Sequence, residues 1–161
     1  MASEGVNTAI LVIAGIIMAS MLSTALISQI GIINNVVRMS SREARDRIAT
    51  SIDIVYVALN TTNSNRHIVM FVKNIGSRDI SIDEIMKIDI YVYDTDKLQL
   101  YTYSQTAYPN HWNFTEIQND GVWRVGETLI IRIYNATDFS IPFNIRIALP
   151  NGVQNEYIYS G

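Results

Sequence analysis

The sequence predicts an all-β fold, an immunoglobulin-like antiparallel β-sandwich, preceded by one long N-terminal transmembrane α-helix. An uncharged apolar run near the N-terminus predicts the helix. From residue 52 onward, about seven short segments of alternating polarity, spaced about ten residues apart, predict the sandwich. The expected organisation is a short lead over residues 1–8, a transmembrane helix over 9–37, a helical stalk over 38–50 and the β-sandwich domain over 51–161.

The predicted membrane segment centres on Ala9 to Ile33. This stretch holds no charge and no proline, and nothing ionisable lies between Glu4 and Arg38. About 20 apolar residues in a helix cross a hydrocarbon core of roughly 30 Å, and a helix satisfies its own backbone hydrogen bonds in lipid. A cleaved signal peptide would have a basic leader and a shorter apolar core. A buried core helix would need more surrounding protein than this chain contains.

The helical pattern continues beyond the membrane segment. Apolar positions recur at helical spacing as far as Ile48, and Glu43 lies four residues before Arg47, a pair that supports an exposed helix. One long helix ending near Thr50 is therefore expected. Two helices broken at Ser40–Ser41 fit the sequence equally well.

The segments after residue 51 alternate with a period of two, as strands with one buried face do. In residues 87–94, Ile88, Ile90 and Val92 share one face. In residues 98–103, Leu98 and Leu100 are predicted to face the core. The stretch 104–121 reads as a long loop with room for a short strand. The predicted strands lie within residues 52–59, 66–74, 87–94, 98–103, 126–135, 143–149 and 155–160.

No pattern in the sequence predicts catalysis, and no cofactor, metal or small-molecule substrate is expected. The absence of cysteine excludes disulfides, thiolate metal sites and a cysteine nucleophile. A formal net charge of −3 gives no electrostatic footprint for nucleic acid. His67 and His111 are isolated, which makes a poor metal site. Asp94 and Asp96 suit a hairpin turn better than a calcium loop, since the glycine and distal glutamate of such a loop are missing.

Two signals disagree about which side of the membrane the β-domain occupies. Three Asn-X-Thr sequons are possible N-glycosylation sites, and as a group they favour export. Basic residues after the helix favour the cytoplasm by the positive-inside rule. We expect the domain outside. The sequon asparagines are Asn60, Asn113 and Asn135, and the basic residues are Arg38, Arg42, Arg45 and Arg47.

Tyrosines on the outward face of the predicted strands form a possible interface. Tyrosine is enriched at protein interfaces because its ring is buried while its hydroxyl stays hydrogen-bonded. The alternative is that they line a second sandwich face or merely favour strands. The predicted outward tyrosines are Tyr91, Tyr93, Tyr101, Tyr103 and Tyr134.

Several segments resemble the FlaG proteins of the archaeal flagellum, the archaellum. They are the opening MASEGVNTAILVIAGIIMAS, VKNIGSRDIS with its surroundings, the VGETL turn at Val125 to Leu129, and LPNGV at Leu149 to Val153. The sister FlaF family shares the plan of one helix and one sandwich. The MASE start and the apolar run favour FlaG.

The resemblance implies a non-catalytic, stator-like component anchored in the archaeal cell membrane, with its sandwich beneath the surface layer. It also implies self-association into a homo-oligomer, a FlaF-like partner and, through that partner, contact with the S-layer. Archaellins carry a basic processing site before their apolar helix. Here Glu4–Gly5 has no Lys or Arg ahead of it, so no such cleavage is expected.

Two alternatives come from other functional classes. The chain could be a pilin-like filament subunit, in which case its N-terminus would be processed. It could instead be a membrane-tethered module that binds a glycan or solute through the aromatic stretch Tyr108 to Trp123. Substitution of Trp112 or Trp123 would then abolish sugar binding.

Overall fold

A computed structural model describes residues 2–60, 67–95, 97–106, 109–116, 118 and 120–161. These residues form two compact units. The first covers residues 1–44 and the second residues 45–161.

The N-terminal unit consists of a single helix, α1, which runs from Ala2 to Ala49 and enters the second unit with its last residues. The helix continues through Ser40–Ser41, so the one-helix alternative is the correct one. At 1.5 Å per residue its 48 residues span about 72 Å. Within the apolar part of the helix, the hydroxyls of Ser20, Ser23 and Thr24 each donate to the backbone carbonyl four residues earlier.

The second unit is a β-domain whose regular elements follow the predicted periodicity closely. The stretch 104–121, predicted as a loop with room for a short strand, contains β6, and the short strand β7 follows it directly. In chain order the elements are β1 (Ile52–Asn60), β2 (His67–Asn74), β3 (Ile80–Ser81), α2 (Ile82–Ile85), β4 (Asp89–Tyr93), β5 (Leu98–Tyr103), β6 (His111–Thr115), β7 (Val122–Trp123), β8 (Thr128–Tyr134), β9 (Phe143–Ala148) and β10 (Gln154–Tyr159).

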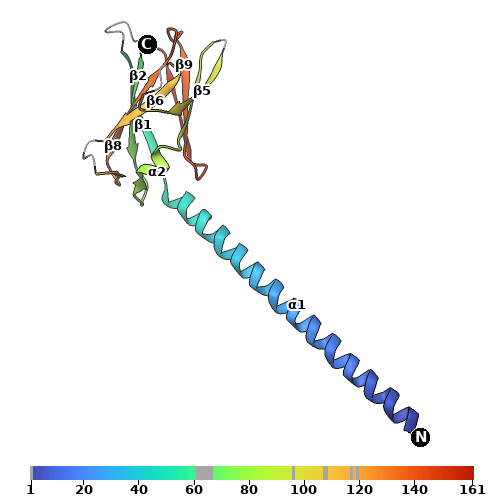
Figure 1. Ribbon diagram of the computed structural model, residues 1–161. Helices are drawn as coiled ribbons and strands as arrows, with labels where there is room; N and C mark the ends of the chain where they lie inside the picture. Colours follow the sequence, from blue (N-terminus) through green and yellow to red (C-terminus); the bar gives the residue numbers. More distant parts are fainter. Residues whose placement is uncertain (1, 61–66, 96, 107–108, 117, 119) are drawn as a thin grey trace. The chain divides into compact units, whose positions relative to one another are not determined.

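The strands form two antiparallel layers joined into one eight-stranded sheet (Figure 1). The order is β1-β2-β8-β6-β5-β4-β9-β10, and β3 pairs separately with β7. Among the described strands, β5 and β6 are the one pair that runs in parallel, through Thr102 with His111 and Tyr103 with Trp112. The β-sandwich prediction is therefore confirmed, with the addition that this parallel pair nearly closes the sheet into a barrel.

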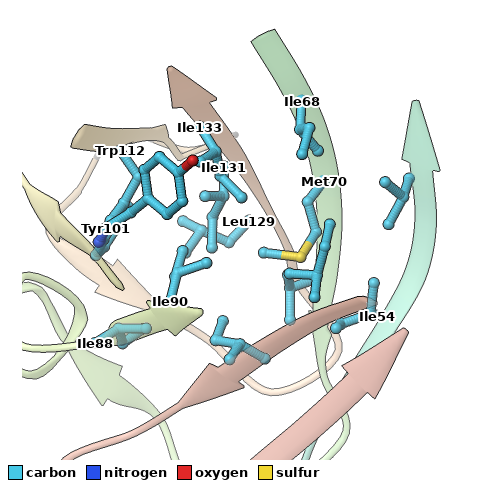
Figure 2. Close-up of a cluster of buried hydrophobic side chains, with 14 of the residues drawn as sticks. Ile54, Ile68, Met70, Ile88, Ile90, Tyr101, Trp112, Leu129, Ile131 and Ile133 are labelled. Atoms are coloured by element: carbon cyan, nitrogen blue, oxygen red, sulfur yellow. The ribbon is translucent and has the colours of Figure 1, made fainter. Parts of the chain in front are cut away.

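The core fills the space between the two layers. Ile68, Met70 and Val72 of β2 face Ile90 and other apolar residues of the opposite layer, and all of these are fully buried. Figure 2 shows such side chains from several strands pointing into a common interior. Burying an aliphatic side chain contributes about 1.5–3 kcal/mol, so this alternation is the main force that selects the fold.

Candidate functional site

The described residues contain no group of three or more His, Asp or Glu side chains placed to hold a metal ion. His67 and His111 instead stack on the two sides of Tyr134, with ring centroids 5.1 and 4.9 Å away. Burial lowers the pKa of His111. The Asp94 carboxylate accepts hydrogen bonds from the backbone N–H groups of Thr95 and Ser140, as in a turn.

The first candidate feature is the Thr50 junction, where the last turn of α1 meets the loops of the β-domain. It comprises Asp46, Ala49, Thr50, Asn74, Gly76, Ser77, Arg78 and Asn151, all within residues 45–161. Three segments that carry the FlaG resemblance converge here. VKNIGSRDIS supplies Asn74 to Arg78, LPNGV supplies Asn151, and the N–H of Gly126 in VGETL donates to the carbonyl of Asn74 at 2.7 Å.

The Thr50 hydroxyl is the centre of the junction. It donates to the carbonyl of Asp46 at 2.6 Å, one turn back in the helix. It accepts from Arg78 Nε at 2.6 Å and from Asn151 Nδ2 at 2.8 Å. Thr50 is buried. One side chain thus ties the end of α1 to two loops that lie 28 and 101 residues away in sequence.

A charged pair, Arg78 and Glu84, lies next to the Thr50 hydroxyl and orients one of its hydrogen-bond donors. Arg78 and Glu84 form a two-pronged contact, with Nη2 to Oε1 at 2.6 Å and Nη1 to Oε2 at 3.2 Å. The Arg78 hydrogen bond lowers the pKa of Glu84, and the same bond raises the pKa of Arg78. Glu84 also accepts the backbone N–H of Ser81 at 3.1 Å. The guanidinium is therefore held in the orientation in which its Nε reaches Thr50.

Asn74 and Gly76 shape the loop that receives the helix end. The fully buried Asn74 amide donates to the carbonyls of Arg78 and Trp123 and accepts the N–H of Gly76. The loop then pairs with the helix end, because Ser77 N–H donates to the Ala49 carbonyl at 2.8 Å. A Cβ on Gly76 would lie 2.6 Å from that carbonyl oxygen. Only glycine fits this approach.

The second feature is the outer apolar face, formed by Tyr91, Tyr93, Leu98, Leu100 and Ile158 on the outward side of the layer β5-β4-β9-β10. Strand register places Leu98, Tyr93, Asn144 and Ile158 in one row across the four strands. Ile158 is 72% exposed, Leu98 64% and Tyr93 53%.

A groove of about 340 Å³ runs between these side chains. It is lined by Tyr91, Tyr93, Leu98, Asn144 and Arg146. Arg146 also forms an ion pair with Glu156 on β10. Exposed apolar side chains that gather around a groove, with charge at its border, are typical of a binding surface.

The predicted orientation of β5 is wrong. Tyr101 is only 1% exposed and packs in the core beside Phe139, and burial raises its pKa. Tyr103 also points inward and contacts Trp112 and Phe114. Both faces of β5 carry large apolar side chains. The tyrosines take the buried face because their larger rings fill more of the core.

The remaining tyrosines do face outward. Tyr91 and Tyr93 belong to the outer apolar face, opposite the buried Ile90 and Val92. Tyr134 lies on the outward side of the other layer, half-covered by the two histidine rings. Of the predicted outward tyrosines, Tyr91, Tyr93 and Tyr134 therefore do face outward. On the outer apolar face, Tyr91 and Tyr93 are joined by Leu98 and Leu100, which were predicted to face the core, and by Ile158, which the sequence did not single out.

The two tryptophans are core residues. Trp112 and Trp123 are both fully buried, and the Trp123 indole N–H donates to the Glu127 carbonyl at 2.9 Å. Buried rings offer no stacking platform for a sugar. The glycan-binding alternative therefore loses the two residues on which it depended, while Tyr108 lies outside the described residues.

The three sequon asparagines lie at one end of the layer β1-β2-β8-β6. Asn60 is the last residue of β1, Asn113 lies within β6, and Asn135 follows β8 directly. Thr61 and Thr62 of the first sequon lie outside the described residues.

Comparison with solved structures finds chains of similar fold. The archaellum periplasmic stator protein FlaG from Sulfolobus acidocaldarius is similar over 68% of this chain and 99% of its own, with 23% identity and a TM-score of 0.56. The archaellum periplasmic stator protein complex FlaF and FlaG from the same organism contains a chain similar over 67% of this chain and 87% of its own, with 24% identity and a TM-score of 0.54. Both likenesses show a shared fold, which agrees with the resemblance to FlaG seen in the motifs.

Sequence comparison finds two further likenesses, each of which covers nearly the whole chain. A protein of Archaeoglobus fulgidus, described only as uncharacterized, is 25% identical over 163 residues and is matched over 98% of both chains. The family model of archaeal-type flagellin matches residues 2–157, which include both the apolar helix and nearly all of the β-domain. The chain therefore belongs to the archaeal-type flagellin family.

Proposed function

We propose that this protein is a membrane-anchored, non-catalytic stator element of the archaellum machinery. The observation that carries the proposal is the likeness of its β-domain to the stator protein FlaG, in a chain that also has an apolar N-terminal helix. The β-domain lies outside the cell membrane, self-associates, and binds a FlaF-like partner that links it to the S-layer. The assembly is a static element against which the archaellum rotates.

The helix supports anchoring in the membrane. It is long and apolar enough to cross a bilayer, and its apolar side chains are exposed along its length. Residues 9–37 span about 43 Å as a helix, more than the roughly 30 Å of a hydrocarbon core. Residues 38–50 form the stalk that ends in the Thr50 junction. Force carried along the helix backbone then enters the β-domain at Thr50, where hydrogen bonds spread it over two loops.

Protease treatment of intact cells tests the location. We expect the β-domain to be digested in intact cells, while a cytoplasmic control protein is degraded only after lysis. Protection of the β-domain until lysis would place it in the cytoplasm and overturn the stator proposal. The positive-inside reading of the four arginines would then be correct.

The second candidate function is that of a filament subunit, which the match to archaeal-type flagellin favours. Mass analysis of the membrane-retained fragment from the same digest tests this candidate. We expect the fragment to keep Met1 or Ala2, because the leader lacks the basic residues of an archaellin processing site. A fragment that begins just before the apolar run would show processing and support the filament subunit.

The outer apolar face is the proposed contact surface for the FlaF-like partner. Replacing Leu98 and Ile158 by aspartate places charges on the two most exposed residues of the row that joins Leu98, Tyr93, Asn144 and Ile158. We expect the affinity of the detergent-solubilised chain for the FlaF-type protein of the same organism to fall at least about tenfold, which equals about 1.4 kcal/mol. Isothermal titration calorimetry measures the change.

Tyr56→Asp is the matched control, because Tyr56 is 56% exposed on the outward side of the other layer. It should leave the affinity unchanged. If Tyr56→Asp weakens the complex and the Leu98 and Ile158 variants do not, the partner binds the opposite layer. Light scattering of the same variants shows whether self-association uses the outer apolar face as well.

A further inference from the structure

The end of the apolar run carries a strip of hydrogen-bond donors along one side of α1. Asn34 and Asn35 are followed by Arg38 and Arg42 at spacings of three and four residues. Residues three or four apart lie on the same side of a helix, so these four side chains form one continuous strip. All four lie in the N-terminal unit. We call them the donor strip.

The donor strip is exposed and meets no acid of its own helix. In the described part of the chain, none of its four side chains makes a hydrogen bond or an ion pair. Glu43 is next to Arg42 in sequence but points to another side of the helix, because successive residues are about 100° apart. Ile33 and Val36 occupy the opposite side. The two arginine charges can therefore meet an anion from outside the chain.

Position along the helix places the donor strip at the level of lipid head groups. Arg38 and Arg42 lie about 1.5 and 7.5 Å beyond Val37 along the helix axis. The head-group layer adds about 5–7 Å to each side of the hydrocarbon core. Helical side chains lean toward the N-terminus, which here is the membrane side. The guanidinium groups therefore reach this layer, and the amides of Asn34 and Asn35 lie at its inner border.

The chemistry of the donor strip matches that of an anionic head group. A guanidinium is a planar fork whose N–H groups can donate to two oxygens of one phosphate. Arg38 and Arg42 are one turn apart, so both can contact lipids beside the helix. Basic residues next to a membrane are attracted to its anionic lipids, and each one raises the affinity several-fold.

We propose that the donor strip binds anionic phosphate head groups of the lipids around α1, with Arg38 and Arg42 as the charged contacts. The proposal rests on the membrane anchoring in the proposed function. It gives the two arginines a role on the outer side of the membrane, where the positive-inside rule does not expect them. The bound lipids hold α1 at a fixed depth, and so fix the level at which the stalk leaves the bilayer.

Native mass spectrometry of the detergent-solubilised full chain tests the proposal. The chain is titrated with phosphatidylglycerol, whose head group is anionic, and with phosphatidylcholine of the same acyl chains, whose head group is neutral overall. We expect the native chain to bind the anionic lipid at least about tenfold more tightly, and the double variant Arg38→Gln, Arg42→Gln to bind the two lipids within about threefold of each other. The same preference in both chains, whether large or absent, overturns the proposal.

Two single substitutions in α1 form a matched pair, because each removes one charge. Arg47 lies outside the donor strip, with its Cζ 3.9 Å from the place that a Cβ on Gly152 would take, beside a loop of the β-domain. We expect Arg42→Gln to lower the preference for the anionic lipid about threefold and Arg47→Gln to leave it unchanged. An equal loss in both variants would show that only the total charge matters, which contradicts a site at the donor strip.

An acidic protein partner is the competing explanation for the donor strip. Calorimetry with the FlaF-type protein of the same organism tests it on the same double variant. We expect the affinity for that protein to stay unchanged. A double variant that keeps its lipid preference but binds the FlaF-type protein more weakly would assign the donor strip to the protein and overturn lipid binding.

Alkaline extraction of native membranes separates the two possible failures. A chain that stays in the membrane pellet, with a lipid preference that the double variant does not change, overturns lipid binding by the donor strip and leaves the stator proposal standing. A chain that is released into the supernatant is not anchored by α1, and both proposals fail.

Discussion

Replacing Gly76 by alanine is expected to destabilise the β-domain by roughly 2–3 kcal/mol, toward the upper end of the range for overpacking. The added Cβ would lie 2.6 Å from the Ala49 carbonyl oxygen and 2.7 Å from the Ser51 nitrogen. Both atoms belong to the backbone, so no side-chain rotation relieves the contact. The loop must move, which strains the hydrogen bonds from Ser77 N–H to Ala49 and from Ile75 N–H to Ser51.

An opposing effect is smaller. Gly→Ala substitutions stabilise proteins by about 0.4–1 kcal/mol where the native conformation suits alanine, because the unfolded chain loses freedom. The steric cost at Gly76 exceeds this gain, so the net sign is destabilising. Denaturant unfolding of the detergent-solubilised chain, followed by the fluorescence of Trp112 and Trp123, measures the free energy.

Ser77→Ala is the control for Gly76→Ala. It adds no atom and removes only a long hydrogen bond of 3.4 Å from the Ser77 hydroxyl to the Ala49 carbonyl. We expect a change within about 0.5 kcal/mol. Equal stability of Gly76→Ala and the native chain would mean that the helix end is not seated against the loop as the structure shows.

Replacing Trp123 by alanine is expected to cost about 3–5 kcal/mol, the range for removing a large buried aromatic side chain. Trp123 is fully buried, and its indole N–H donates to the Glu127 carbonyl. Its own carbonyl accepts from the Asn74 amide at 3.2 Å, so the cavity opens beside the Thr50 junction. A loss of this size is a large part of the stability of an ordinary domain.

The same substitution distinguishes a core residue from a ligand-binding one. Removal of a sugar-stacking ring from a surface would leave stability nearly unchanged. Tyr93→Ala serves as the control, because Tyr93 is a large aromatic residue that is 53% exposed, and a change of about 0.5 kcal/mol or less is expected. Unfolding measured through Trp112 compares the two variants. A Trp123→Ala chain as stable as Tyr93→Ala would restore the glycan-binding alternative.

Most of the fold was predictable because the strands have one buried face. The period-two pattern located β1, β2, β4, β8, β9 and β10 within a few residues. The pattern failed in β5, where Leu98, Leu100, Tyr101 and Tyr103 make both faces apolar. There the choice depends on tertiary contacts that periodicity does not show: Tyr101 packs beside Phe139, and Tyr103 packs against Trp112 and Phe114.

The Thr50 junction could not be derived from periodicity. Its contacts join residues 28 and 101 positions apart, and its central side chain is a small polar residue at a helix end. In the sequence, these residues stood out only as parts of the short motifs that resemble FlaG. The motifs do not show that the residues contact one another. The sequence predicted two residues of the outer apolar face, Tyr91 and Tyr93. It did not predict Leu98 and Leu100 there, because the orientation of β5 was predicted wrongly.

The near-closure of the sheet also bears on how the protein tolerates crowding. β1 and β10 are the end strands of the sheet order, yet they lie beside each other, and the Asn155 side chain accepts the Ile54 N–H at 3.3 Å. Exposed end strands invite edge-to-edge pairing and aggregation between copies. Here each end strand shields the other. Copies of the domain can therefore come close together without pairing through these strand edges, and contacts between copies are left to sheet faces and loops.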